Sequence, residues 1–316
     1  MRFNDNANLD TSQVEDRRGS GGGGGGGGFR LGRGGIAGGG LGIVGILVFV
    51  AIQLFSGGSS GSGGGGLGGA LSQLGAGGAA VPNTAVDSGS LDCQAGASSS
   101  DDCEVLAIVN SVQAFWKQQL ASSGTPYTNS KTVFFSGQTP TGCGTGETGM
   151  GPFYCPSDKQ VYIDLSFWQQ LKTDFGANDA LFTQAYVLAH EYGHHVQDLL
   201  GTNSRVSGAA GATSGSVRLE LQADCYAGVW ANHASTVAGS DGQILISGIT
   251  AADVDNALDT AGKIGDDYIQ THLGGGQVDQ SQFTHGSSAQ RKKWFSAGYQ
   301  SGKPQSCNTF DTNNLG

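Results

Sequence analysis

The sequence predicts an α+β fold that is mostly helical and contains a small β-sheet. Apolar residues recur at helical spacing in several long segments. Only two short runs, Thr132–Phe135 and Gln160–Leu165, have the β-branched and aromatic composition that is typical of strands. Many helices combined with few strands favour helices that pack on a small sheet, and the chain has no internal repeat.

Glycine-rich sequence limits where a folded domain can begin. Glycine accounts for 57 of the 316 residues, and much of it falls in two blocks, 19–28 and 56–78. The first block has no apolar side chain and the second has only scattered leucines, so neither can bury a core. We therefore expect residues 1–35 to be a disordered tail, residues 56–90 to be a linker, and residues 91–316 to form one folded domain.

Between the two blocks, residues 36–55 carry no charge over about 20 positions, which is long enough for a helix to cross a bilayer. Because arginines precede this stretch and no basic residue follows it closely, the positive-inside bias predicts a single-pass cell-membrane anchor. The N-terminus would lie in the cytoplasm and the domain in the periplasm or outside the cell. A cleaved signal peptide is the alternative, but the leader is long and no small-x-small site follows. The four arginines nearest to the stretch are Arg17, Arg18, Arg30 and Arg33.

All six cysteines follow the charge-free stretch, and an even number in an exported domain favours disulfides. Six cysteines allow 15 pairings. A zinc–cysteine site is the alternative, but the sequence has no Cys-x-x-Cys. The formal net charge of −10 argues against a nucleic-acid partner. The pairs that lie nearest along the chain are Cys93–Cys103, Cys143–Cys155 and Cys225–Cys307.

The first two predicted helices are recognised by signals at opposite ends, an N-terminal cap for the first and a C-terminal stop for the second. The first covers Glu104–Leu120, has an apolar stripe and is capped by Asp101 or Asp102. The second covers Asp179–Leu200 and is stopped by Gly201.

Three further helices are predicted after a flexible loop at 207–215. They cover Ser216–His233, a segment that begins at Thr250 with a capping box, and Ser288–Gln300, which Gly302 ends.

The motif that points to chemistry is His190-Glu191-Tyr192-Gly193-His194 on the second helix. One helical turn separates His190 from His194, so both imidazoles project from the same face and can hold one Zn²⁺ per chain. Glu191 can then reach the open, water-occupied position on the metal. The alternative is two core histidines beside a surface glutamate.

A catalytic zinc needs a third protein ligand. Gln197 and Leu200 occupy the positions where a third histidine would follow, which excludes that version of the site. The helix at 216–233 instead carries Glu220 and Asp224, four residues apart on one face. Glu220 is expected to bind the metal, and Asp224 to accept a hydrogen bond from a ligand histidine. Because both carboxylates sit among apolar neighbours, they need a partner.

These two motifs, His-Glu-x-x-His followed by Glu-x-x-Ala-Asp, resemble the pattern of gluzincin metallopeptidases. The chain is more specifically similar to a bacterial family described as putative neutral zinc metallopeptidases, whose biological substrate is not defined. The resemblance implies a zincin-like domain after one membrane anchor, with zinc as cofactor and a peptide or protein as substrate. It is carried by the stretches 151–156, 161–164, 185–197, 265–267 and 283–288.

A more distant similarity links the chain to membrane-associated gluzincins of the CAAX-protease and heat-shock-protease kind. These carry a late histidine with an arginine six positions on, as His285 and Arg291 do here, although Gly286 replaces the usual proline. The resemblance implies that one of the two stabilises the oxyanion during hydrolysis. The alternative is a histidine at a helix N-terminus and a surface arginine.

The remaining candidates have structural interpretations. His195 points about 100° away from His194 around the helix and is expected to be packed. Asp266 and Asp267 fit cap and turn chemistry better than cation binding. His233 and His272 have no partner spacing. Tyr162 and Asp164 lie on a strand that we expect to be the sheet edge, where an extended peptide could pair.

The sequence therefore predicts amide hydrolysis by a zinc-activated water, with Glu191 as the general base. Two alternatives stay open: a zinc-stabilised envelope scaffold without activity, and a metal-free domain held by its disulfides. The presence of Glu191 favours the enzyme, because a scaffold needs only the ligands.

Overall fold

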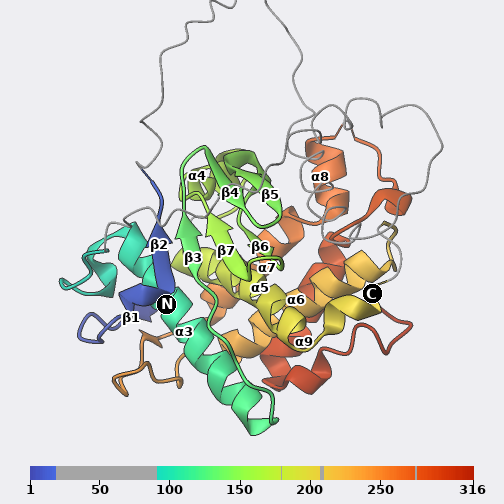
Figure 1. Ribbon diagram of the computed structural model, residues 1–316. Helices are drawn as coiled ribbons and strands as arrows, with labels where there is room; N and C mark the ends of the chain where they lie inside the picture. The colour runs from blue at the N-terminus through green and yellow to red at the C-terminus, as the bar shows by residue number, and fades with distance from the viewer. Residues whose placement is uncertain (19–90, 179, 207–209, 275) are drawn as a thin grey trace, which may run out of the picture.

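The computed structural model describes residues 1–18, 91–178, 180–206, 210–274 and 276–316 (Figure 1). The predicted anchor, the linker and both glycine blocks lie outside these residues. Among the residues that are described, no helix combines the length and the apolar character needed to span a bilayer.

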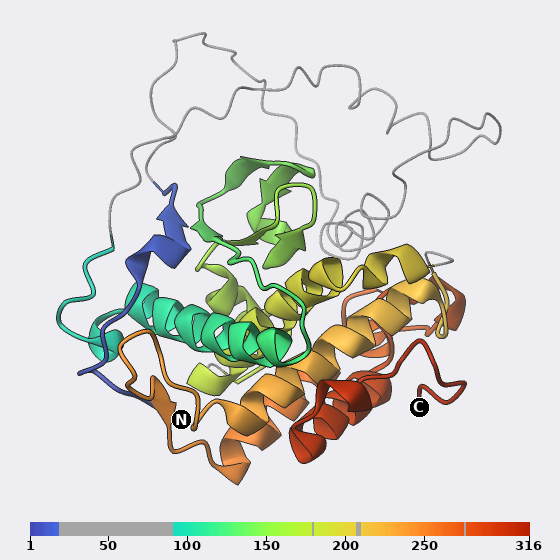
Figure 2. The ribbon, with the colours of Figure 1, turned by 60° about the horizontal axis from the view of Figure 1, so that its bottom comes forward.

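Helices are the main regular structure of the described chain and pack around α6, which runs between α5 and α9 (Figure 2). The fold is α+β with small sheets, as predicted. Its zincin-like identity stays a prediction. The helices are α3 (Asp101–Ser122), α4 (Phe167–Thr173), α5 (Leu181–Leu199), α6 (Gly215–His233), α7 (Ala251–Lys263), α8 (Asp266–His272) and α9 (Ser288–Ser301).

The boundaries of the five predicted helices agree with the sequence signals to within a few residues, whereas the short helices α4 and α8 were not predicted. Ser100 caps α3 by accepting from the Cys103 amide, in place of the expected aspartates. The capping box at the start of α7 is confirmed, with Thr250 and Asp253 bonding reciprocally. Gly302 ends α9 in the left-handed region, at a φ of 62°.

The main sheet has four strands in the order β2-β3-β7-β6. Strands β2 and β3 are parallel, as are β3 and β7, whereas β6 is antiparallel to β7. The prediction that the strand at 160–165 forms the edge is wrong, because β6 covers it. The strands are β2 (Val14–Asp16), β3 (Thr132–Phe134), β6 (Phe153–Cys155) and β7 (Gln160–Ile163).

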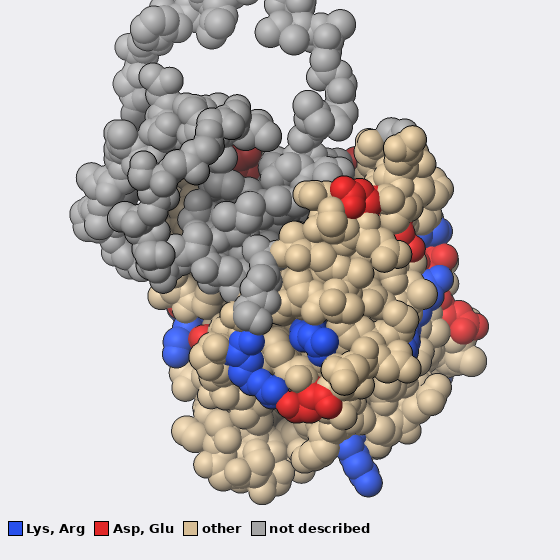
Figure 3. Space-filling model, turned by 90° about the vertical axis from the view of Figure 1, so that its right-hand side faces the viewer, with Lys and Arg blue, Asp and Glu red and all other residues tan. Residues whose placement is uncertain are grey.

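Two small strand pairs complete the fold. Strand β4 (Gln138–Thr141) pairs with β5 (Gly144–Glu147), and β1 (Arg2–Phe3) pairs with β8 (Ile246–Ser247). On the face that Figure 3 shows, charged side chains are few and scattered.

Residues 1–18, which we call the N-terminal segment, belong to the folded domain. They supply β1 and β2, and they bury Val14 and Ala7 in the main core. The prediction of a disordered tail at 1–35 is therefore wrong for residues 1–18, and the domain does not begin at residue 91. The physical reason is that the lack of a side-chain core concerns only the glycine block that starts at residue 19, whereas the N-terminal segment contains no glycine.

Three disulfides join the cysteine pairs that lie nearest along the chain, as predicted. Cys93–Cys103 ties the chain before α3 to the first turn of that helix. Cys225–Cys307 ties α6 to the segment after α9 across a sequence separation of 82 residues. Closing long loops restricts the unfolded chain, which stabilises the folded state.

Candidate metal centre

The helices α5 and α6 bring the three predicted ligands together. The ligand atoms of His190, His194 and Glu220 all lie within 4.8 Å of one another. His190 Nε2 lies 3.2 Å from Glu220 Oε2, and His194 Nε2 lies 3.4 Å from Glu220 Oε1. Two imidazole nitrogens and one carboxylate that converge in this way are the donor set of a catalytic zinc site with an open position.

The second nitrogen of each histidine supports metal binding. His190 Nδ1 donates to Asp224 Oδ1 at 2.9 Å, and His194 Nδ1 donates to Gln197 Oε1 at 2.9 Å. Because each Nδ1 carries the proton, each Nε2 can offer its lone pair to a metal. The residues present therefore fit zinc. Gln197 was missed as a partner, although it lies three residues after His194 on the same helix face.

A small residue lets the two helices approach. A Cβ placed on Gly193 would lie 3.0 Å from Ala223 Cα and 3.1 Å from the Ala223 carbonyl oxygen. The glycine inside the first motif thus faces the alanine inside the second motif. Their close contact sets the separation between the two histidines and Glu220.

Asp224 is the centre of a buried hydrogen-bond network. It has no exposed surface, and it accepts from the Tyr186 hydroxyl at 2.6 Å as well as from His190. Arg291 donates to it through Nε at 2.8 Å and through Nη2 at 2.9 Å. Burial alone would raise the pKa of Asp224, but Arg291 and His190 outweigh it and hold that pKa at about 2. A permanent carboxylate thus orients His190.

Arg291 lines the cavity beside His190, but its guanidinium is held by other groups of the protein. The residue is 3 % exposed, binds Asp224 with two nitrogens and also donates to the Ile264 carbonyl at 3.1 Å. The alternative of a surface arginine is wrong, and a role of Arg291 at an oxyanion stays a prediction. Arg291 lies behind His190 and neutralises the aspartate that orients it.

Glu191 lies beside the ligands and is 8 % exposed. Burial raises the pKa of its carboxyl, while the two ligand histidines and a backbone hydrogen bond from Tyr154 oppose that shift. Tyr154 lies on β6, the edge strand, so the predicted general base contacts the sheet edge. A carboxyl with a raised pKa is a better proton acceptor in catalysis at neutral pH.

His285 lines the same cavity as His190, Glu191 and Glu220. Its Nδ1 donates to Asp266 Oδ1 at 3.1 Å, which leaves Nε2 available. Burial would lower the pKa of His285, but the hydrogen bond and charge of Asp266 raise it. The imidazolium is thereby favoured, as an oxyanion partner requires.

Asp266 also shapes the loop that carries His285. Its Oδ2 accepts from the amides of Thr284, His285 and Gly286 at 2.8, 2.8 and 2.9 Å. The prediction of turn chemistry is confirmed for Asp266. Its second role as the partner of His285 was missed, because the two residues are 19 positions apart and no periodic pattern links them.

The cavity next to the ligands has a largely apolar wall. Phe153 comes from β6, and Phe167 comes from α4. Such walls suit an apolar side chain of a ligand. The apolar lining residues include Met150, Pro152, Phe153, Phe167, Phe175, Val187, Ile264 and Ile269.

The other histidines have structural partners. His195 is buried, and its Nε2 lies 2.7 Å from the Thr128 carbonyl, as expected for a packed residue. His233 Nε2 lies 2.9 Å from the Gly302 carbonyl, and His272 stacks on Tyr268.

The residues expected on the sheet edge are structural. The Tyr162 hydroxyl donates to Asp158 at 2.7 Å, and Asp164 accepts from the Gly137 amide at 3.0 Å. Both side chains are therefore engaged within the domain.

Comparison with known proteins agrees with this geometry. A family described as "Putative neutral zinc metallopeptidase" matches residues 1–310. The uncharacterized protein Rv2575 of Mycobacterium tuberculosis is 48% identical over 228 residues, which cover 71% of this chain and 76% of the relative. The uncharacterized protein YpfJ of Escherichia coli K12 is 46% identical over 209 residues, which cover 64% of this chain and 69% of the relative. No solved structure matches. The chain belongs to the "Putative neutral zinc metallopeptidase" family.

Proposed function

We propose that the protein is a zinc-dependent metallopeptidase that hydrolyses peptide bonds in a peptide or protein substrate. The observation that carries the proposal is the convergence of His190, His194 and Glu220 within 4.8 Å, with Glu191 next to them in the same cavity. A non-catalytic zinc scaffold would not need Glu191 at that place. Family membership supports the same class of chemistry.

His190, His194 and Glu220 would hold Zn²⁺, which would supply a Lewis acid for activating a water molecule and polarising the scissile carbonyl. Glu191 accepts the proton of the attacking water and delivers it to the departing amine. His285 donates a hydrogen bond to the carbonyl oxygen as negative charge develops on it. Asp224 and Gln197 keep the ligand histidines oriented through their Nδ1 atoms.

The apolar wall of the cavity favours a substrate with a bulky apolar side chain next to the scissile bond. Met150, Phe153 and Phe175 are mostly buried within that wall. An aspartate or lysine side chain there would lose its hydration without gaining a partner. We therefore expect phenylalanine or leucine peptides to be cleaved in preference to aspartate or lysine peptides.

Two measurements on the purified full-length protein test the proposal. Elemental analysis is expected to find about one zinc per chain, and a mixed peptide library is expected to be cleaved. Chelation should abolish cleavage, and added Zn²⁺ should restore it. Protein with stoichiometric zinc but no cleavage would favour the scaffold, and protein without bound zinc would exclude both metal-based functions.

The charge-free stretch at 36–55 lies outside the described residues. We propose that it brings the peptidase to the cell membrane, because its length and lack of charge suit a bilayer. Cell fractionation of the full-length chain tests this. Recovery in the soluble fraction would contradict it.

A further inference from the structure

The N-terminal segment is held along its whole length by the rest of the domain. At its start, β1 pairs with β8. Asn4 bonds the loop before β8, through its amide to the Leu245 carbonyl at 3.0 Å and through Nδ2 to the Ile244 carbonyl at 3.0 Å. Both classes of donor on Asn4, backbone and side chain, are thus satisfied by the same loop.

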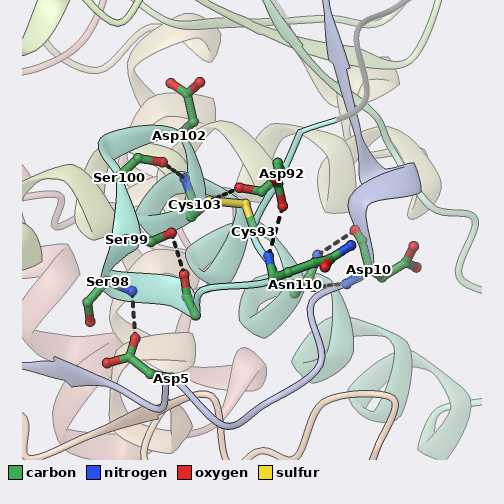
Figure 4. The surroundings of a disulfide bond; sticks show 12 residues. Asp5, Asp10, Asp92, Cys93, Ser98, Ser99, Ser100, Asp102, Cys103 and Asn110 are labelled. Atoms are coloured by element: carbon green, nitrogen blue, oxygen red, sulfur yellow. Dashed lines mark hydrogen bonds between the residues drawn. A yellow bond between two sulfur atoms is a disulfide. The ribbon is translucent and has the colours of Figure 1, made fainter.

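The middle of the segment packs against the first turns of α3 and the Cys93–Cys103 disulfide (Figure 4). Asp5 Oδ1 accepts from the Ser98 amide at 2.7 Å. The Asp10 amide donates to Asn110 Oδ1 at 2.7 Å, and Asn110 Nδ2 donates back to the Asp10 carbonyl at 3.2 Å. This reciprocal pair satisfies backbone groups of the segment that would otherwise need water.

The end of the segment completes the main sheet. Strand β2 pairs with β3, and the Arg17 amide extends the ladder to the Phe134 carbonyl at 2.8 Å. Arg18 forms a two-point ion pair with Asp102, at 2.9 and 2.5 Å. Val14 is 8 % exposed. Loss of β2 would expose Val14 and the ladder groups of β3 together.

Strand β3 connects this pairing to the metal centre. The Thr132 hydroxyl lies 2.9 Å from the Tyr192 hydroxyl, and Tyr192 also donates to the Ser130 carbonyl at 3.2 Å. Tyr192 stands between the two ligand histidines in the sequence. The strand that β2 covers is therefore in contact with the ligand helix.

We propose that the N-terminal segment and residues 91–316 occupy the same compartment, so that the chain leaves the domain at Arg18 and returns at Leu91 on one side of the membrane. A single crossing by residues 36–55 would place β2 and β3 on opposite sides. Strands pair across about 5 Å, whereas the hydrocarbon core of a bilayer is about 30 Å thick. The paired sheet and opposite compartments are thus incompatible.

Two of the arginines on which the predicted membrane orientation rests also have a role in the fold. Arg18 binds Asp102 and Asp16 in the folded domain, and the Arg17 guanidinium donates to Glu15 at 2.7 Å and to the Pro140 carbonyl at 3.1 Å. Of the five arginines before the charge-free stretch, Arg17 and Arg18 thus serve the fold. Their presence carries less weight for membrane orientation than the positive-inside bias assumes.

Biotinylation in living cells tests the compartment directly. A biotin-acceptor peptide is inserted into the full-length chain either within the glycine run at 21–28 or within the Gly/Ser run at 56–66, and biotin ligase is expressed in the cytoplasm. We expect the two insertions to give the same result, both biotinylated or both unmodified. Biotinylation of the first insertion alone would overturn the proposal.

Docking is tested on the purified full-length chain by placing a specific protease site in the same 21–28 run. After cleavage, the released N-terminal fragment is expected to co-elute with the remainder in gel filtration. Val14→Asp should weaken its retention by at least about tenfold, because the strand would bury a charge. Val278→Asp is the matched control, since Val278 is 46% exposed, and should retain the fragment. A wild-type fragment that elutes alone would overturn the proposal.

Discussion

The α5–α6 helix pair and the N-terminal segment are held in place by different kinds of contact. In the helix pair, a few buried charged groups meet at one point, with Glu220 and Asp224 on α6 facing the histidines of α5. The N-terminal segment instead makes many separate backbone and surface contacts, to α3, β3 and β8.

This difference predicts different responses to substitution. Removing one buried charge in the helix pair leaves its partner unpaired, so the effect is large and local. Removing one contact of the N-terminal segment leaves many others, so the effect is small and graded. The following predictions, from the largest expected effect to the smallest, test that contrast.

Glu191→Gln should lower the rate of peptide hydrolysis by about 10²–10⁴-fold, because the amide cannot accept the proton of the attacking water. Zinc content should stay unchanged, since Glu191 is not a ligand. Steady-state kinetics together with elemental analysis measure both. Glu147→Gln on β5 is the control, because that carboxylate lies on the exposed hairpin. Normal turnover by Glu191→Gln would remove Glu191 from the mechanism.

Asp224→Asn should weaken zinc binding by about 10–100-fold, because the amide holds His190 less firmly through its Nδ1 proton. The variant also leaves Arg291 buried without its charge partner, so the free energy of unfolding should fall. Competition with a chromophoric chelator measures the affinity. Asp255→Asn on the exposed face of α7 serves as the matched control. Unchanged zinc affinity would show that Asp224 does not orient the ligand.

Acid should loosen the N-terminal segment. The hydrogen bond from Arg18 lowers the pKa of Asp16. Burial would raise the pKa of Asp10, but hydrogen bonds from Ser12 and Gln13 lower it overall. Because these folded-state pKa values lie below the unfolded value of 3.8, their stabilisation is present above that pH and is lost as the pH falls below it. Hydrogen exchange of residues 1–18 between pH 6 and pH 3 measures the loss. Unchanged protection at pH 3 would contradict it.

Arg18→Ala should lower the free energy of unfolding least, by about 0.2–1 kcal/mol, because the Arg18–Asp102 pair is partly exposed and screened by solvent. Urea denaturation of Arg18→Ala, Asp102→Ala and the double variant gives the coupling energy of the pair. A coupling energy above about 2 kcal/mol would be as large as that of a buried ion pair. It would contradict the expectation that single contacts of the N-terminal segment have small effects.

Much of the metal centre could be predicted because its residues lie at helical spacing within two segments. His190 and His194 share a face, and so do Glu220 and Asp224, whatever the rest of the fold does. Gln197 follows the same rule and could have been found. The role of Arg291 could not, because its contact with Asp224 joins residues 67 positions apart.

The N-terminal segment was mispredicted for a related reason. Its composition is polar and its strand β2 is three residues long, so no amphipathic pattern of its own marks it as folded. Its partners lie far along the chain, as with Asn110, 100 positions from Asp10, and Asp102, 84 positions from Arg18. Such contacts cannot be predicted until the positions of β3 and α3 in the folded chain are known.

The sequence by itself determined five of the helices and the candidate donor set for zinc, because those residues recur at helical spacing. It also indicated the three disulfide pairs, because each cysteine bonds to its neighbour in the order of the chain. The tertiary structure alone decided that Arg291 neutralises Asp224, that Asp266 orients His285, and that β2 covers β3. The physical reason is that burial determines which charges must be paired, and burial depends on the packing of distant segments.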